Sequence, residues 1–185
     1  LDGLATGFSM VSDLVYLYNT IGVAYTSGNG DYAEWLERAD HGEHIGPGDV
    51  VGVRGGKISK DVTDAEQVMV VSHKPIVRGN VPKQAETHKG NDVAFMGQVP
   101  VKVMGPVKTG DYIVASDNLP GWAIAVDPNS MKGDDHLRAV GRSWEAYSAN
   151  GPKLVNTVIG VHNGDWVKVV KKLDRRQQAT EQRLE

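Results

Sequence analysis

Short β-prone runs separated by turn residues constrain this chain more than any other feature of its sequence. From Asp49 to Val170, stretches rich in Val, Ile, Tyr and Trp alternate with Gly, Pro, Asn and Asp, at spacings of roughly a dozen residues. No helix-length periodic segment lies between these runs. The pattern predicts a mostly β fold, an antiparallel sandwich or barrel. The expected strands are 50–53, 57–59, 68–72, 99–103, 112–115, 123–126, 139–144, 155–159 and 166–169.

One short phrase recurs at the start of several of these runs. Gly-Asp followed by two β-prone residues occurs at 48–51, 110–113 and 164–167, and a looser copy occurs at 30–33. Glycine adopts positive φ at little cost, and an Asp side chain can accept hydrogen bonds from nearby backbone N–H groups. In the first three copies the phrase therefore indicates a turn that leads into a strand, whereas the copy at 30–33 has different surroundings. In the same way, the glycines of 54–56 predict a tight hairpin between 50–53 and 57–59.

The two ends of the chain differ in composition from this central region. Residues 1–26 carry small and apolar side chains without a clean period and are interpreted as an upstream segment or linker, whereas 27–169 is the β-rich domain. Residues 170–185 are rich in Lys, Arg, Gln and Glu, which predicts a C-terminal helix. A solvated helical tail and a short coiled coil both fit this segment. A coiled coil would pair with further copies of the chain, along a seam formed by Val170, Leu173, Gln177, Thr180 and Leu184.

Charge and composition exclude several classes of function. The 185 residues have a formal net charge of −3, which argues against a nucleic-acid binder that works by bulk charge. The longest apolar stretches, 14–17 and 68–71, are too short to cross a bilayer, and no signal peptide is visible. The absence of Cys excludes disulfide frameworks and thiolate metal sites.

No cofactor or metal ion is expected from the sequence. The run Gly55-Gly56-Lys57-Ile58 lacks the first glycine of a phosphate-binding P-loop, and Ile58 occupies the position where that loop needs a hydroxyl group. His41 and His44 flank Glu43, but the spacing places no further ligand for a zinc site beside these histidines.

Two carboxylates follow a flexible linker near the start of the β-rich region. The run 27–30, Ser-Gly-Asn-Gly, leads directly into Asp31, and Glu34 follows three residues later. If the chain turns helically after Gly30, Asp31 can cap the turn and Glu34 can reach back, as in a capping box. Alternatively, the two carboxylates could meet on one side of that turn and cleave the Gly30–Asp31 bond, one activating water and the other donating a proton. The residues alone leave both interpretations open.

The same segment carries a family resemblance. Residues 27–35, together with 48–51, 55–58 and 99–112, resemble the peptidase G2 family, the intramolecular-chaperone autoproteolytic domain at the C-termini of phage appendages and fibre proteins. The resemblance covers about residues 27–169. It implies a module that helps three fibre chains assemble and then cuts itself away, with Asp31 and Glu34 as the catalytic pair and Gly30–Asp31 as the cleavage junction. The family has a serine where this chain has Gly30.

Two functional hypotheses follow. The first is a trimeric assembly domain of a fibre, spike or surface appendage, attached to an upstream stalk, located on a virion or cell surface, and self-cleaving at Gly30–Asp31. The second is a structural or adhesive β-domain that stays on the mature assembly and binds a surface glycan through Trp122 or Trp144. The Asp-Tyr-Ala-Glu run at 31–34 favours the first hypothesis, and Gly30 in place of serine favours the second.

Overall fold

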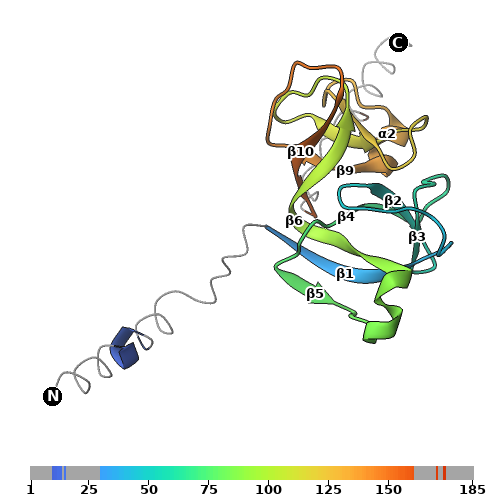
Figure 1. Ribbon diagram of the computed structural model, residues 1–185. Helices are drawn as coiled ribbons and strands as arrows, with labels where there is room; N and C mark the ends of the chain where they lie inside the picture. Colours follow the sequence, from blue (N-terminus) through green and yellow to red (C-terminus); the bar gives the residue numbers. More distant parts are fainter. Residues whose placement is uncertain (1–9, 14, 16–29, 161–169, 171–172, 174–185) are drawn as a thin grey trace, which may run out of the picture.

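The computed structural model describes residues 10–13, 15, 30–160, 170 and 173, and its fold is built from residues 30–160 (Figure 1). Within that range ten strands form one sheet, with a 3-10 helix and a short α-helix outside it. The strands are β1 (Gly30–Arg38), β2 (Val50–Arg54), β3 (Lys57–Ser59), β4 (Gln67–Val71), β5 (Val77–Gly79), β6 (Gly90–Met104), β7 (Tyr112–Ala115), β8 (Ala123–Val126), β9 (Ala139–Ser143) and β10 (Pro152–Ile159). The helices are η1 (Gln84–Lys89) and α2 (Gly133–Arg138).

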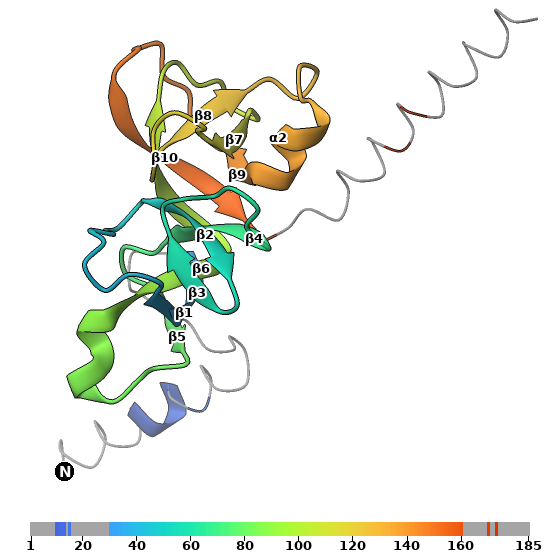
Figure 2. The same ribbon diagram turned by 90° about the vertical axis from the view of Figure 1, so that its right-hand side faces the viewer.

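The long strand β6 holds the sheet together. Its first half pairs with β1 and β4, and its second half pairs with β10 and β8. As a result β1 to β5 gather around one end of β6 and β7 to β10 gather around the other, as two roughly perpendicular views show (Figures 1 and 2). Most pairings are antiparallel, but β1–β3, β1–β5 and β6–β8 are parallel. The predicted mostly β class is confirmed, and the sheet is mixed rather than purely antiparallel.

Valine and isoleucine side chains fill the interior. In the second half of β6, Val99, Val101 and Val103 alternate with more exposed residues, so one face of the strand is fully buried. They belong to a cluster that reaches into both halves of the fold, and a second, smaller cluster lies around Val51, Ile58 and neighbouring residues of the β1–β5 half. Branched side chains pack well on a pleated surface, which explains why these runs form strands.

The recurring Gly-Asp phrase forms the same turn at two places. The Asp49 carboxylate accepts a hydrogen bond from the N–H of Gly46 at 2.8 Å, and the Asp111 carboxylate accepts one from the N–H of Lys108 at 2.8 Å. The glycine before each Asp has a positive φ, 79° in the first turn and 90° in the second. The interpretation as turn chemistry is confirmed for these two copies, and the copy at 164–167 lies outside the described residues.

Both turns also have the same position in the sheet. Val71, at the end of β4, donates its N–H to the carbonyl of Asp49 and accepts from the N–H of Gly48. Ser143, at the end of β9, makes the same two backbone bonds with the second turn. Each turn then opens a strand, β2 or β7, which pairs antiparallel with β4 or β9 respectively. The fold thus contains two copies of one turn-and-strand unit.

The other predicted elements have mixed outcomes in the structure. The hairpin between β2 and β3 forms as predicted, with both central glycines at positive φ. Strand β5 and the first half of β6 were not predicted, because 90–98 contains Gly, Asn and Asp, which are rare in strands. The predicted strand 166–169 lies outside the described residues, as does most of the predicted helix 170–185. Its two described members, Val170 and Leu173, are helical and more than half exposed.

Candidate functional site

The segment that holds Asp31 and Glu34 is a strand, so the expected helical turn is wrong. Residues 30–37 pair antiparallel with 98–90 of β6, and this ladder outweighs the local capping signal of the sequence. Burial alternates along the strand: Asp31 and Ala33 are buried, whereas Tyr32 and Glu34 are exposed. Because successive side chains of a strand point to opposite faces, the two carboxylates of one chain lie on opposite faces of the sheet.

The link from β4 to β5 brings Ser72 to the Asp31 carboxyl. Strand β4 pairs with β6 and β5 pairs with β1, so the link crosses from one side of the β1–β6 pair to the other. At its start the N–H of Ser72 donates to the carbonyl of Asp92, and at its end the N–H of Ile76 donates to the carbonyl of Asp31 at 2.8 Å. Asp31 is only 1% exposed under this arrangement.

Three buried side-chain oxygen atoms have no hydrogen-bond partner in the described part of the chain. They are Asp31 Oδ2, Ser72 Oγ and Asp92 Oδ1. The other oxygen of Asp92, Oδ2, lies 2.9 Å from Nε of Arg78 on β5. Buried oxygens without donors are unusual in folded proteins, and each calls for an explanation, such as a catalytic role, local strain or an ordered water.

Burial raises the pKa of the Asp31 carboxyl above its ordinary value, because the charged form loses its hydration. The Ser72 hydroxyl lies near the carboxyl and its dipole favours the charged form, although the pair does not reach hydrogen-bond geometry. His73 acts in the same direction, and the negative charge of Asp92 acts in the opposite one, adding to the rise in the pKa of Asp31. The carboxyl thus favours its neutral, proton-carrying form more than an exposed Asp does.

The Gly30–Asp31 peptide lies against a glycine of β6. Asp31 is the sheet partner of Gly97, and a Cβ atom added to Gly97 would lie 1.9 Å from the carbonyl oxygen of Gly30. Gly97 also has a φ of 114°, in the region that side chains disfavour. Just beyond, the pairing register shifts between Tyr32 and Ala33, a β-bulge. Gly97 therefore provides the space in which the predicted cleavage junction lies.

Glu34 has a different environment from Asp31. It is the sheet partner of Gly79 on the short strand β5, and its Cγ would lie 3.0 Å from a Cβ added at that glycine. The side chain thus extends over β5 on the exposed face of the sheet. In this position it is accessible to another molecule.

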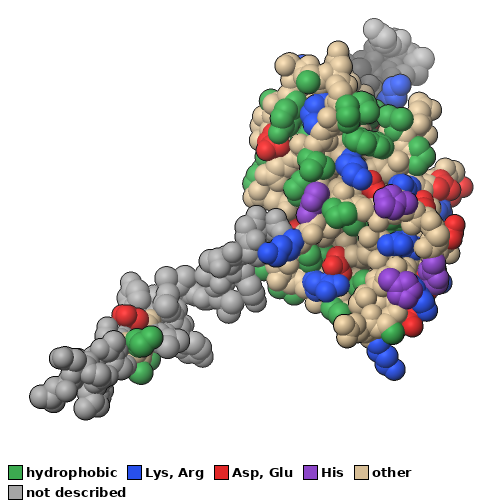
Figure 3. Space-filling view, in the orientation of Figure 1, with side chains coloured by type: hydrophobic (Ala, Val, Ile, Leu, Met, Phe, Trp, Pro, Cys, Tyr) green, Lys and Arg blue, Asp and Glu red, His purple; other side chains and the backbone are tan. Residues whose placement is uncertain are grey.

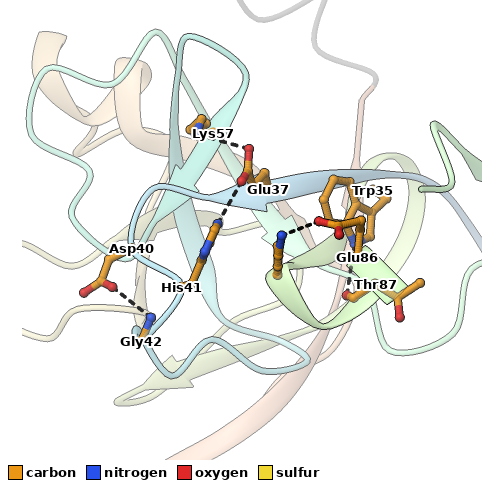
Figure 4. Close-up of polar contacts among 9 residues, drawn as sticks. Trp35, Glu37, Asp40, His41, Gly42, Lys57, Glu86 and Thr87 are labelled. Atoms are coloured by element: carbon orange, nitrogen blue, oxygen red, sulfur yellow. Dashed lines mark hydrogen bonds and ion pairs between the residues drawn. The ribbon is translucent and has the colours of Figure 1, made fainter. Parts of the chain in front are cut away.

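The C-terminal half of β1 is fixed by polar contacts (Figure 4). Glu37 lies between His41 and Lys57, with oxygen–nitrogen distances of 2.8 and 3.1 Å. Hydrogen bonds from His41 and Lys57 lower the pKa of the Glu37 carboxyl. The indole N–H of Trp35 donates to the carbonyl of Thr87 in η1 at 3.3 Å. These contacts hold the strand that carries the candidate pair.

The histidines considered as metal ligands do not converge on one site. His41 contacts Glu37, and among the described residues no group of three or more His, Asp or Glu side chains is placed to hold a metal ion. On the face shown in Figure 3, histidine side chains lie over the half of the molecule formed by β1 to β5. No helix in the described ranges is long and apolar enough to span a membrane.

A groove of about 590 Å³ lies between the β2–β4 region and α2. Acidic and basic side chains line this groove, including Lys60, Asp61 and Asp134. Its Arg138 is already paired with Asp117 and Asp135. The lining has five acidic side chains against two basic ones, so the charge of the groove is predominantly negative and disfavours an anionic ligand.

The two tryptophans considered for glycan binding differ in exposure. Trp144, just after β9, is 54% exposed, while Trp122 is partly buried before β8. The backbone N–H of Trp144 donates to the carbonyl of Asn156 on β10, which places the two residues opposite each other. The Asn156 amide in turn donates to Gln98. An exposed indole beside amide groups is the kind of surface that a sugar ring can stack on.

Two solved structures of gene product 12 of bacteriophage phi29 share this fold. A C-terminal fragment of that protein superposes with a TM-score of 0.50 and 17% sequence identity, over 70% of this chain and 99% of the fragment. The pre-mature protein superposes with a TM-score of 0.51 and 16% identity, over 75% of this chain but only 23% of its own length. No family model and no curated protein matches the sequence, so the peptidase G2 resemblance stays a prediction.

Proposed function

We propose that this chain is a C-terminal assembly domain of a virion fibre, spike or appendage, which forms a homotrimer and cleaves itself at Gly30–Asp31. The observation that carries the proposal is the position of that bond. It lies at the first residues of β1, where the described fold begins, next to a buried carboxyl with an unpaired oxygen. The fold likeness to the C-terminal fragment of the phage protein, one of whose structures is of the pre-mature form, supports a processed virion component.

The geometry of β1 constrains how Asp31 and Glu34 would work together. Within one chain they lie on opposite faces of the sheet, so one carboxyl cannot assist the other at the same bond. A site with both groups then combines Asp31 of one chain with Glu34 of a neighbouring chain. Cleavage would follow assembly, because an isolated chain has half of the site.

Such coupling suits a fibre protein. A β-rich fibre depends on many non-local contacts and has exposed strand edges, so chains in the wrong register fold slowly and aggregate. A domain that trimerises first raises the effective concentration of the chains attached to it. The two described members of the predicted seam, Val170 and Leu173, are 54% and 58% exposed, as expected of apolar residues that await a partner.

A mixing experiment tests the shared site. Asp31→Asn and Glu34→Gln chains, distinguished by isotope labelling, are unfolded together, refolded as a mixture, and followed by intact mass. Neither variant should cleave alone. In the mixture, the Glu34→Gln chain, which keeps Asp31, should be cut into 1–30 and 31–185, because the other chain supplies Glu34.

The remaining outcomes are equally informative. If the unmutated chain cleaves but neither chain of the mixture does, the two carboxylates act within one chain and the shared site is rejected. An unmutated chain that trimerises and stays intact would reject self-cleavage and leave the assembly role. Glu37→Gln is a matched control on the same strand, since Glu37 already pairs with His41 and Lys57, and it should cleave as the unmutated chain does.

The second candidate function is glycan adhesion, and the exposure of Trp144 favours it. A Trp144→Ala variant should lose binding on a glycan array while keeping its oligomeric state, whereas Trp122→Ala, at the less exposed position, should keep binding. An unmutated chain that binds no glycan on the array rejects this candidate.

A further inference from the structure

The Asp31 carboxyl lies in a cluster of three oxygen-bearing side chains, of which Asp31 and Ser72 are buried and Asp92 is 21% exposed. Asp31 and Ser72 are 1% and 5% exposed, and each contributes an oxygen without a hydrogen-bond partner in the described part of the chain. Asp92 contributes the third such oxygen. We propose that Ser72 and Asp92 are positioning residues that set the protonation of the Asp31 carboxyl in opposite directions, Asp92 favouring the neutral acid and Ser72 favouring the carboxylate. The catalytic consequence drawn below rests on the proposed function.

The three residues come from three different segments that the sheet brings together. Asp31 is on β1, Asp92 is on β6, and Ser72 follows β4 at the start of the link to β5. The N–H of Ser72 donates to the carbonyl of Asp92 at 2.9 Å, so Ser72, just beyond the end of β4, lies beside Asp92 of β6. The link then reaches β1, where Ile76 bonds to the carbonyl of Asp31. The cluster depends on this crossing and exists only in the folded chain.

The groups around Asp31 have opposite effects on its protonation: some favour the neutral acid and others favour the carboxylate. Asp92 on β6 is a like charge, which disfavours a second carboxylate nearby, and Arg78 on β5 partly neutralises Asp92. His73, next to Ser72 in the link, favours the carboxylate when it is protonated, as does the Ser72 hydroxyl dipole. Opposing influences of this kind can hold an acid close to the working pH, where proton transfer is most effective.

A neutral Asp31 has a specific use in cleavage of its own peptide bond. Hydrolysis adds the oxygen of water to the carbonyl carbon of Gly30 and breaks the bond between that carbon and the Asp31 nitrogen. The electron pair of the broken bond goes to the nitrogen, which takes the proton of the Asp31 carboxyl and leaves as an amine. The proton released by the water goes to a carboxylate, Glu34 of a neighbouring chain in the proposed mechanism, and passes back to Asp31 through solvent.

The test measures the protonation of Asp31 directly. In the full chain with Glu34→Gln, which keeps the bond intact, the ¹³C signal of the Asp31 carboxyl is followed against pH and assigned by its loss in Asp31→Asn. Ser72→Ala should move the titration midpoint of Asp31 to higher pH. Asp92→Asn should move it to lower pH, and Arg78→Gln, which leaves Asp92 charged without its cation, should move it to higher pH. Ser59→Ala and Asp127→Asn, outside the cluster, should leave it unchanged.

A merely structural role would give a different pattern. If Ser72 and Asp92 only support packing, both variants admit water and move the midpoint the same way, toward the ordinary value of an Asp. That result, or no shift in either variant, overturns the inference. In the cleaving chain with Glu34 present, the alkaline limb of the pH profile should shift as the midpoint does. Opposite midpoint shifts in a chain that never cleaves would reject the proposed function and leave the tuning of Asp31 in place.

Discussion

At the residue scale, the burial of Asp31 makes the stability of the fold depend on pH. The Asp31 carboxyl is 1% exposed and has an oxygen that accepts no hydrogen bond. Its charged form is therefore less stable in the folded chain than in the unfolded chain, where water solvates it. Its pKa is therefore raised in the folded state, chiefly by burial. The folded state then binds a proton more tightly than the unfolded state. Its contribution to stability is fully present below the ordinary pKa and is lost as the pH rises through the raised one.

Replacing Asp31 by Asn should remove this dependence. The comparison uses the uncleaved Glu34→Gln chain, with Asp31 present or replaced by Asn. As the pH rises from acid to neutral, the chain with Asp31 should lose free energy of unfolding relative to the chain with Asn. Urea unfolding at a series of pH values and fixed protein concentration measures the difference. A difference that is flat with pH, or that grows in favour of the chain with Asp31, would contradict the prediction. Glu37 provides a contrast, because the pKa of its carboxyl is lowered in the folded state. Its contribution to stability is therefore lost as the pH falls, and this contribution is small because the side chain is exposed to solvent.

At the scale of elements, the two Gly-Asp turns are alike in backbone but differ in their side-chain partners. Both Asp side chains accept a backbone N–H three residues earlier. The Asp49 carboxylate also forms an ion pair with a lysine, because Nζ of Lys102 on β6 lies 2.5 Å from Oδ1 of Asp49. Asp49 is buried and Lys102 is half-buried, so this ion pair ties the first turn to the central strand.

The two turns should therefore differ in their sensitivity to truncation. Asp111→Ala leaves a backbone N–H unpaired and should lower the free energy of unfolding by about 1 kcal/mol. Asp49→Ala also leaves a partly buried lysine without its partner and should lower it by about 3 kcal/mol. Denaturant unfolding of both variants, and of Asp49→Ala combined with Lys102→Met, which removes the lysine charge left without a partner, measures the difference. Equal losses for the two Asp variants would show that the ion pair contributes nothing.

Two glycines, Gly97 on β6 and Gly141 on β9, offer a second comparison at this scale. Added Cβ atoms at Gly97 and Gly141 would lie 1.9 and 2.1 Å from carbonyl oxygens of neighbouring strands. Both Ala variants should thus lower the melting temperature. Only Gly97→Ala should slow cleavage and shift the Asp31 carboxyl signal, because only Gly97 lies against the Gly30–Asp31 peptide. Equal effects of the two variants on cleavage would mean that Gly97 acts through stability alone.

At the scale of the whole molecule, β6 joins two halves that each contain one turn-and-strand unit. The proposed trimer adds a further level, with the C-terminal segment as a parallel seam between copies. Light scattering of the chain with and without residues 170–185 tests this arrangement. The full chain should be a trimer, and the shortened chain should dissociate at concentrations at which the full chain stays trimeric. A monomer in both cases would reject the assembly role.

Local signals in the sequence were sufficient for much of the fold. The runs that became β2, β3, β7 and β8 have their predicted bounds within a residue, because turn glycines and β-branched residues act over a few positions. The Gly-Asp turns at 48–49 and 110–111 were also predicted correctly, since the side chain bonds within its own turn. The assignment of Asp31 and Glu34 as a catalytic pair came from their spacing and from a family resemblance, and it stays a prediction.

The tertiary structure decided what these local signals could not. Asp31 and Glu34 carry a helix-capping pattern, yet pairing with β6 over 30–37 makes the segment a strand and separates the two carboxylates. Ser72 and Asp92 were not singled out, because no local pattern marks a serine and an aspartate that meet only through the link between β4 and β5. Short-range hydrogen bonds and side-chain shape thus determined the turns and most strands from sequence alone. Burial and neighbouring charge at Asp31 depend on residues far apart in the chain, so only the folded structure determined them.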